Sequence, residues 1–177
     1  MPRLFTGLEI PAQIAAELAE LRGGIAGARW VEPQNYHITL RFIGDVDIAE
    51  ARDVAEALEE IRRARLTIAF EGLGWFGADK PRAIVAKIKP TAPLVELQGE
   101  HERWLRRVGL APETRKFAPH VTLARLTRAA PLAVADYLGH RAFLGPRQFE
   151  AARFVLYSAR DSTGGGPYLV EAAYPLD

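Results

Sequence analysis

The chain contains one four-residue pattern twice: His, a β-branched residue, Thr and Leu, at residues 37–40 and again at residues 120–123. Both copies lie in runs whose composition and alternation predict a β-strand. Side chains alternate between the two faces of a strand, so His and Thr share one face in each copy and the apolar residues share the other. Any fold of this chain must therefore bury one side of two strands and leave a His–Thr pair on the other.

The repetition is what makes the pattern informative. A single copy is best explained as a strand histidine beside a threonine of high β propensity. The chain has four histidines, and for two of them to share a Thr at the same offset is a coincidence on the order of one in a hundred such sequences. We therefore interpret His37, Thr39, His120 and Thr122 as candidate catalytic residues.

Two histidines on facing strands suit the opening of a cyclic phosphodiester. Water must lose a proton as it attacks phosphorus, and the departing ribose oxygen must gain one. Histidine, with an ordinary pKa of about 6.5, exists in both protonation states near neutral pH. Two of them could act as base and acid, each contributing about 10²–10⁴ in rate, while threonine hydroxyls hydrogen-bond the phosphate oxygens. This chemistry needs no metal, and the sequence has no H-E-x-x-H motif.

The composition excludes several other classes of protein. The absence of cysteine rules out disulfides, thiolate nucleophiles and Cys-based zinc sites. No apolar run approaches the roughly 18 residues that a membrane span needs. The N-terminus leads directly into strand-like sequence with no signal-peptide pattern, which with the missing cysteines predicts a cytoplasmic protein. The net charge of +1 argues against coating of nucleic acid by bulk electrostatics, and it neither demands nor forbids an RNA substrate.

Strands and helices are interleaved without strict alternation. Asp47 and Glu50 predict a capping box at the second helix, and residues 164–166, three glycines, predict a turn. The mixed order is typical of an α+β protein with helices packed outside a sheet, and we expect one compact unit over residues 1–177. The expected strands are residues 4–10, 36–43, 66–70, 82–88, 119–126, 153–158 and 168–173, with a short extended piece at residues 29–31. The expected helices are residues 11–21, 48–61, 93–108 and 131–138.

Residues 30–46 and 117–125 resemble the two signature strands of the 2'-5' RNA ligase-like proteins, and residues 3–11 resemble their first strand. This family, also called RNA 2',3'-cyclic phosphodiesterase, belongs to the two-histidine phosphoesterase superfamily. The resemblance implies two similar α+β lobes related by a pseudo-twofold axis. Their mostly antiparallel sheets would line a central cleft, with helices packed outside and both His–Thr pairs pointing into the cleft.

The resemblance also implies an activity and roles for the residues. The chain would hydrolyse 2',3'-cyclic phosphate ends of RNA, such as those of tRNA halves, to 2'-phosphomonoesters without a metal or other cofactor. A weak, ATP-independent joining of RNA ends through 2'-5' linkages would accompany it. His37 would be the proton donor and His120 the proton acceptor. No membrane and no obligate protein partner is implied, so we expect a monomer.

Two arginines near the motifs are less clear from the sequence. Arg125 continues the family pattern H-x-T-x-A-R and could clamp phosphate. Strand parity places Arg125 on the face opposite His120, unless the strand ends or bulges before it. Both faces of the strand therefore remain open for its side chain. Arg41 has the parity of His37 but lies four residues on, roughly 13 Å along an extended strand. We expect Arg41 to meet the RNA backbone or solvent.

Other features have simpler readings. Residues 72–77 match G-x-G-x-x-G, but no helix follows, so we expect a bent strand end and loop and no dinucleotide site. His101 and His140 are expected at the surface. Two rival functions stay open, because the four motif residues would be the same in each. One is a cyclic phosphodiesterase for ADP-ribose cyclic phosphate or another nucleotide, and the other is a member that binds a nucleotide without turning it over.

Overall fold

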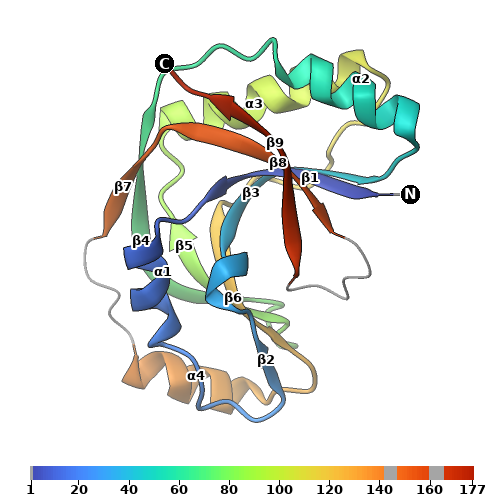
Figure 1. Cartoon of the computed structure of the whole chain (residues 1–177). Coiled ribbons are helices and arrows are strands. Elements are labelled where there is room, and N and C mark those ends of the chain that lie inside the picture. The colour runs from blue at the N-terminus through green and yellow to red at the C-terminus, as the bar shows by residue number, and fades with distance from the viewer. Residues whose placement is uncertain (1, 142–146, 160–165) are drawn as a thin grey trace.

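The computed structural model describes residues 2–141, 147–159 and 166–177. Within them the chain forms strands and helices in an interleaved α+β order (Figure 1). The strands are β1 (Arg3–Glu9), β2 (Ala28–Trp30), β3 (His37–Asp45), β4 (Leu66–Phe76), β5 (Ala83–Ile88), β6 (His120–Leu126), β7 (Gln148–Ala151), β8 (Arg153–Ala159) and β9 (Tyr168–Pro175). The helices are α1 (Ala12–Ala19), α2 (Ile48–Leu58), α3 (Ala92–Arg107) and α4 (Pro131–His140), with a short 3₁₀ turn, η1 (Pro33–Asn35).

The strands form one sheet built from two similar halves. Its order is β7-β4-β5-β6-β3-β1-β8-β9, with β2 paired to β6, and every pairing is antiparallel. The halves meet where β3 runs beside β6, and there the register contains a single pair, Ile38 with Val121. These are the β-branched residues of the two repeated patterns. The expected two sheets are therefore joined by one bridge, and each His–Thr motif lies on the inner strand of its half.

The helices lie on the outer side of the sheet, where they bury its apolar face. Figure 1 shows α2 and α3 beside one half and α1 and α4 beside the other. The predicted capping box starts α2, since the Asp47 carboxylate accepts from Glu50 N and the Glu50 carboxylate accepts from Asp47 N. The main core contains the apolar residues of both motifs, among them Ile38, Leu40 and Val121. This packing holds both motif strands rigidly from behind.

Both motif strands contain a β-bulge at the same place. Thr39 pairs with Gly7 and Arg41 with Thr6, so the register of β3 skips Leu40. In β6, Thr122 pairs with Val85 and Ala124 with Ile84, and the register skips Leu123. A bulge adds one residue to a strand and shifts every later side chain to the opposite face. The residues after the bulge thus have the reverse of the parity that simple alternation gives.

Most expected elements are present, with three differences. The strand predicted over residues 66–70 continues as β4 through Phe76, so most of the G-x-G-x-x-G segment is strand, bent by a register shift between Phe70 and Leu73. The short strand β7 was not predicted. Strand β3 runs through Gly44 and Asp45, where the sequence suggested a stop. The turn predicted over residues 164–166 lies largely outside the described residues.

Candidate active site

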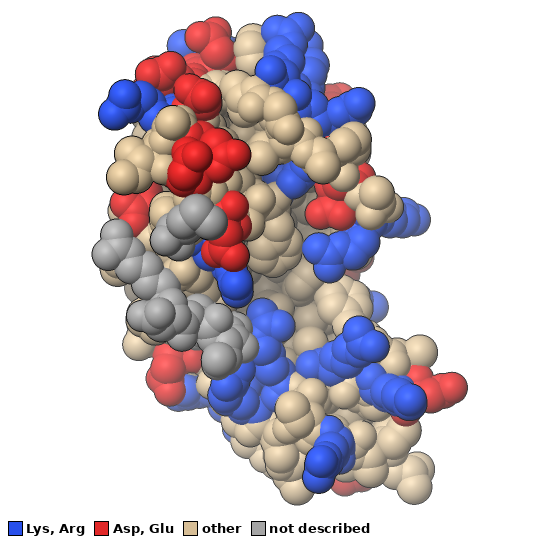
Figure 2. All heavy atoms as spheres, turned by 90° about the vertical axis from the view of Figure 1, so that its right-hand side faces the viewer, with Lys and Arg blue, Asp and Glu red and all other residues tan. Residues whose placement is uncertain are grey.

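The two motifs face a cleft of about 800 Å³ between the halves of the sheet. His37, Thr39, His120 and Thr122 all line it, so the structure brings the four predicted residues together. Figure 2 shows Lys and Arg side chains gathered around the hollow on this face of the molecule. The exposed basic residues that line the cleft are Arg3, Arg82, Arg115, Lys116 and Arg125. An anionic ligand would be attracted to such a cleft even though the whole chain is nearly neutral.

The two histidine rings are held in the same way. Nδ1 of His37 lies 2.9 Å from the carbonyl oxygen of Asn35, and Nδ1 of His120 lies 2.7 Å from that of Ala118. A carbonyl can only accept, so each Nδ1 carries the proton and donates it. This fixes the tautomer and places the lone pair, at which a proton can be accepted, on Nε2 of each ring. Nε2 of His37 is 3.0 Å from Thr39 Oγ1, whose hydroxyl can donate to it.

The surroundings of the two rings differ. His37 is packed among three aromatic rings, with centroid distances of 4.9 Å to Phe5, 5.0 Å to Tyr168 and 5.4 Å to Tyr157. His120 has the edge-on ring of Phe76 at 4.6 Å. These aromatic side chains belong to neither motif. Sequence reasoning missed them because they come from four different strands and carry no shared spacing.

Both histidines have lowered pKa values. The pKa of His37 is lowered to about 4, mainly by burial and to a smaller extent by the nearby His120 and Arg125, against the opposing effect of the Asn35 carbonyl. Burial also lowers the pKa of His120, with a smaller contribution in the same direction from Arg125. A buried ring with a cation nearby disfavours its own charged form. Both rings are therefore neutral at pH 7 before an anion enters the cleft.

Arg125 lines the cleft beside both histidines because of the bulge at Leu123. Leu123 and Ala124 are consecutive buried residues, and Arg125 returns to the open face shared by His120 and Thr122. The bulge was one of the two possibilities that the sequence left open. The position of Arg125 is thereby decided, while its role towards a phosphate stays a prediction.

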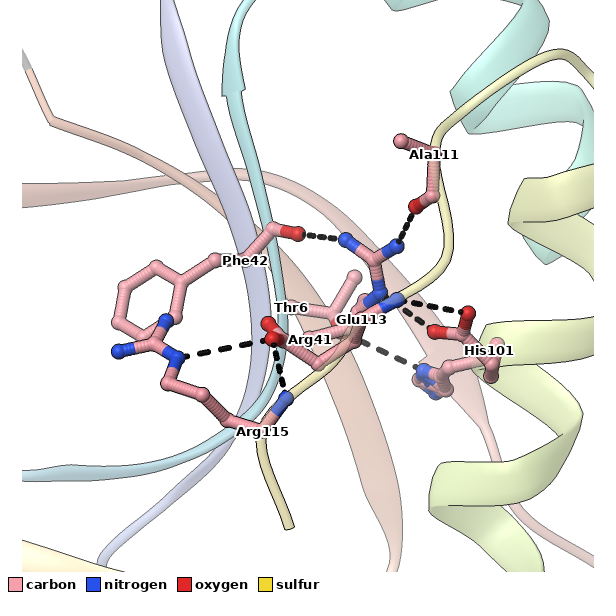
Figure 3. Close-up of polar contacts among 8 residues, drawn as sticks. Thr6, Arg41, Phe42, His101, Ala111, Glu113 and Arg115 are labelled. Atoms are coloured by element: carbon pink, nitrogen blue, oxygen red, sulfur yellow. Dashed lines mark hydrogen bonds and ion pairs between the residues drawn. The ribbon is translucent and has the colours of Figure 1, made fainter. Parts of the chain in front are cut away.

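Arg41 does not lie where the sequence suggested. The bulge at Leu40 directs it into the interior, where the side chain is only 7% exposed. Its Nε donates to the Glu102 carboxylate at 2.6 Å, and its terminal nitrogens donate to the carbonyls of Phe42 and Ala111 (Figure 3). The expectation that Arg41 meets RNA or solvent was wrong, because it assumed unbroken alternation.

His101 also lies elsewhere than the sequence suggested. It is fully buried against the ring of Phe154, and its Nδ1 lies 3.3 Å from the Thr6 hydroxyl (Figure 3). The charged neighbours Glu100 and Glu102 suggested a surface position, but the helix face of His101 points inward. His140 is exposed at the end of α4, as expected.

Two kinds of feature are missing from the described residues. In these parts of the chain no three His, Asp or Glu side chains form a group that could hold a metal ion. Among the helices described, none is both long and apolar enough to cross a membrane.

Comparison with known proteins places the chain in a family. The sequence model of the family of LigT-like phosphoesterases matches residues 8–85 and 88–168. The chain belongs to this family. It is 41% identical over 125 residues to the RNA 2',3'-cyclic phosphodiesterase of Aeropyrum pernix, covering 67% of this chain and 71% of that protein. It is 32% identical over 139 residues to the protein of the same name from Archaeoglobus fulgidus, covering 76% and 77%.

Solved structures of other proteins have the same fold. The crystal structure of TT0787 from Thermus thermophilus superposes with a TM-score of 0.83 at 22% identity, covering 98% of this chain and 97% of that one. Escherichia coli LigT in complex with 3'-AMP gives a TM-score of 0.78 at 24% identity, covering 99% of both chains. The α+β architecture with antiparallel strands around a cleft is thereby confirmed.

Proposed function

We propose that this chain hydrolyses 2',3'-cyclic phosphate ends of RNA to 2'-phosphomonoesters by His/His acid–base catalysis without a metal. The observation that carries the proposal is the convergence of His37, Thr39, His120 and Thr122 on one basic cleft. Relatives at 41% and 32% identity carry the name RNA 2',3'-cyclic phosphodiesterase, which supports the proposed substrate. A weak 2'-5' ligation would be the same opening of the cyclic phosphate with an RNA 5'-hydroxyl attacking phosphorus in place of water, and the 3' oxygen would leave as before.

The reaction needs one proton accepted and one proton donated. Water attacks phosphorus and passes its proton to Nε2 of His120. The bond from phosphorus to the 3' oxygen breaks, and that oxygen takes a proton from Nε2 of His37. The product carries a 2'-phosphate and a 3'-hydroxyl. The resemblance supplies the choice of donor and acceptor, since the hydrogen bonds at Nδ1 prepare both rings equally.

The binding of the phosphate would itself prepare the acid. Both rings are neutral in the free cleft because burial lowers the pKa of each. The negative charge of the bound phosphodiester favours a protonated histidine and opposes the effect of Arg125. Arg125 and the two threonine hydroxyls would then hold the non-bridging oxygens, where charge builds up during the attack.

The decisive experiment incubates the purified protein and EDTA with an oligoribonucleotide that ends in a 2',3'-cyclic phosphate. We expect full conversion to the 2'-phosphate, read by phosphorus NMR. Loss of activity on chelation, recovered with added metal, would contradict the metal-free mechanism. Absence of any turnover, with tight binding of the oligonucleotide, would instead favour the non-catalytic alternative.

A substrate panel separates the remaining alternatives. It compares the oligoribonucleotide, 2',3'-cyclic AMP and ADP-ribose 1'',2''-cyclic phosphate by kcat/KM. We expect the RNA end to be the best substrate because the basic residues around the cleft can contact further phosphates of a strand. A higher kcat/KM for the ADP-ribose compound would reassign the substrate and leave the chemistry unchanged.

A further inference from the structure

Asn35 and Ala118 hold equivalent places in the two halves, two residues before His37 and His120. The backbone carbonyl of each accepts from the Nδ1 of its histidine, at 2.9 Å in one half and 2.7 Å in the other. Ala118 shows that this hydrogen bond needs no polar side chain. The Asn35 carboxamide, which belongs to a residue lining the cleft, therefore has no role in the hydrolysis as proposed above.

The Asn35 side chain is held against backbone from another part of the chain. Asn35 ends the turn η1, where its own N donates to the Glu32 carbonyl at 2.8 Å. Its Oδ1 accepts a hydrogen bond of 3.4 Å from Tyr168 N at the start of β9. A Cβ on Gly166, whose φ is +105°, would lie 2.4 Å from Asn35 Cγ, so the carboxamide fills space that only glycine leaves open. The carboxamide thus joins the segment before the first motif to the last strand of the sheet.

The ring of Tyr168 lies against the ring of His37. The two centroids are 5.0 Å apart and the planes meet at 87°, which is an edge-on contact. Tyr168 meets Phe5 in the same way, at 5.1 Å and 82°. Phe5 and Tyr157 are buried in a small hydrophobic cluster, and Tyr168 packs against it as a partly buried member. The residue that donates to Asn35 therefore supplies the least buried of the three aromatic rings beside His37.

We propose that Asn35 is a positioning residue for His37, because its carboxamide fixes the first residue of β9 and so keeps the Tyr168 ring against the histidine. The inference rests on the proposed function, in which His37 moves a proton. Contact with the Tyr168 ring limits how the imidazole can turn and how much water reaches it. In the other half the equivalent residue is Ala118, and among the described residues Phe76 is the ring that lies against His120. The arrangement therefore belongs to one half of the cleft.

The groups around His37 determine what the loss of this contact would change. In the described part of the chain, the titratable and charged groups that face His37 come from four strands: Glu9 of β1, His120 and Arg125 of β6, Tyr157 of β8 and Tyr168 of β9. Asn35→Ala removes none of these groups and keeps the carbonyl that accepts from Nδ1. Its effect would come from water that reaches the ring, and water favours the charged form of an imidazole. Because burial is the main cause of the low pKa of His37, we expect that pKa to rise in this variant.

The test combines two measurements on the full chain. The titration of His37 in the free protein is followed by NMR of isotope-labelled imidazole nitrogens, and kcat/KM for 2',3'-cyclic AMP is measured against pH. The variants are Asn35→Ala, Tyr168→Ala, the double variant of these two, and Tyr168→Phe, which keeps the ring and removes the hydroxyl. The control is Leu169→Ala, since Leu169 is the next residue of β9, is 52% exposed and is not among the residues that line the cleft.

We expect Asn35→Ala to raise the midpoint of the His37 titration by about one pH unit, a fraction of what full burial of a histidine can cause. Tyr168→Ala should raise it at least as much, and the double variant should match Tyr168→Ala because Asn35 acts through that ring. The maximum of kcat/KM lies between the pKa values of the two histidines, so it should move to higher pH by about half a unit. Tyr168→Phe and Leu169→Ala should keep the wild-type midpoint and profile.

Three results would overturn the positioning role. One is an unchanged His37 midpoint and pH profile in Asn35→Ala, in a protein whose His120 still titrates as in the wild type. Another is that the effects of Asn35→Ala and Tyr168→Ala add in the double variant, which would mean that the carboxamide acts without the tyrosine. Should Asn35→Ala fail to fold, equal changes in Tyr168→Ala and Tyr168→Phe would assign the effect to the hydroxyl and refute the ring contact. The NMR titration needs no turnover, so failure of the wild type to open any cyclic phosphate would refute the proposed function alone.

Discussion

The two halves of the cleft have the same backbone conformation and the same His–Thr pattern up to the bulge, and they differ in the side chains that follow it. Each half has a histidine whose Nδ1 donates to the carbonyl two residues earlier, a threonine two residues later, and a bulge at the following leucine. After the bulge one half has Arg41 and Phe42, and the other has Ala124 and Arg125. The shared features are those that phosphate chemistry requires. The differing ones place an exposed Phe42 and a buried Arg41 in one half, and an exposed Arg125 and a buried Ala124 in the other.

The largest expected effect tests the shared part. His37→Ala and His120→Ala should each lower kcat by about 10²–10⁴ if each ring moves a proton. The double variant should be little slower than either single variant, because the two groups act in one step. Initial rates with 2',3'-cyclic AMP provide the measurement. Near-wild-type turnover of either single variant would remove that histidine from the mechanism and break the equivalence of the halves.

The second prediction concerns the buried ion pair of Arg41 with Glu102 and its contribution to stability. Glu102→Ala leaves the Arg41 charge buried without its partner and should cost about 3–5 kcal/mol in the free energy of unfolding, measured in urea. The matched control is Asp45→Ala, which breaks the exposed pair Arg3–Asp45 and should cost less than about 1 kcal/mol. A double variant, Arg41→Met with Glu102→Gln, should recover much of the loss because no charge is stranded. Equal costs for the two single variants would show that Arg41 is not desolvated.

The third prediction concerns Arg125, the exposed arginine that follows the second motif. Arg125→Ala should lower kcat/KM on any cyclic phosphate, with or without a base, by about 10- to 150-fold, the value of a charge-assisted hydrogen bond. Leu132→Ala, at a side chain that is 84% exposed on α4, serves as the control. A loss confined to substrates with a base would mean that Arg125 contacts the base and not the phosphate.

The pH profile of the same variant sharpens the comparison. The proposed mechanism needs one proton shared over two histidines, so kcat/KM should be bell-shaped with its maximum between their two apparent pKa values. Both are lowered from the usual 6.5, His37 to about 4, which puts the maximum below pH 6.5. Arg125 lowers both, so its removal raises both and should shift the maximum to higher pH. A shift to lower pH would contradict this account.

The sequence predicts the two motifs well and the residues after them poorly. Periodicity of two places His37 with Thr39 and His120 with Thr122, and the structure agrees. Beyond Leu40 and Leu123 the alternation breaks, because a bulge depends on pairing with a neighbouring strand that a single sequence does not reveal. Arg41 was expected to meet RNA or solvent and is buried for this reason.

His101 shows a different limit, because the relevant signal was present. The buried residues of α3 are Leu94, Leu97, His101 and Leu105, spaced as one face of a helix. The charges on either side of His101 in the sequence lie on other faces and carry no information about it. Position in the helical period was the better guide than the charge of the nearest neighbours.

The smallest expected effect comes from this buried histidine, which has no counterpart in the other half. Burial, with a smaller contribution from Arg41, lowers the pKa of His101 to about 3, against about 6.5 in the unfolded chain. Between pH 6.5 and 3 the unfolded state therefore binds a proton that the folded state does not, and stability falls as the pH falls. The slope from this residue is about 1.4 kcal/mol per pH unit. His101→Leu should reduce the measured slope by that amount in urea titrations at pH 6, 5 and 4. His140→Gln, at an exposed site, should leave it unchanged, and an equal change in both variants would mean that acid destabilisation does not arise from the buried ring.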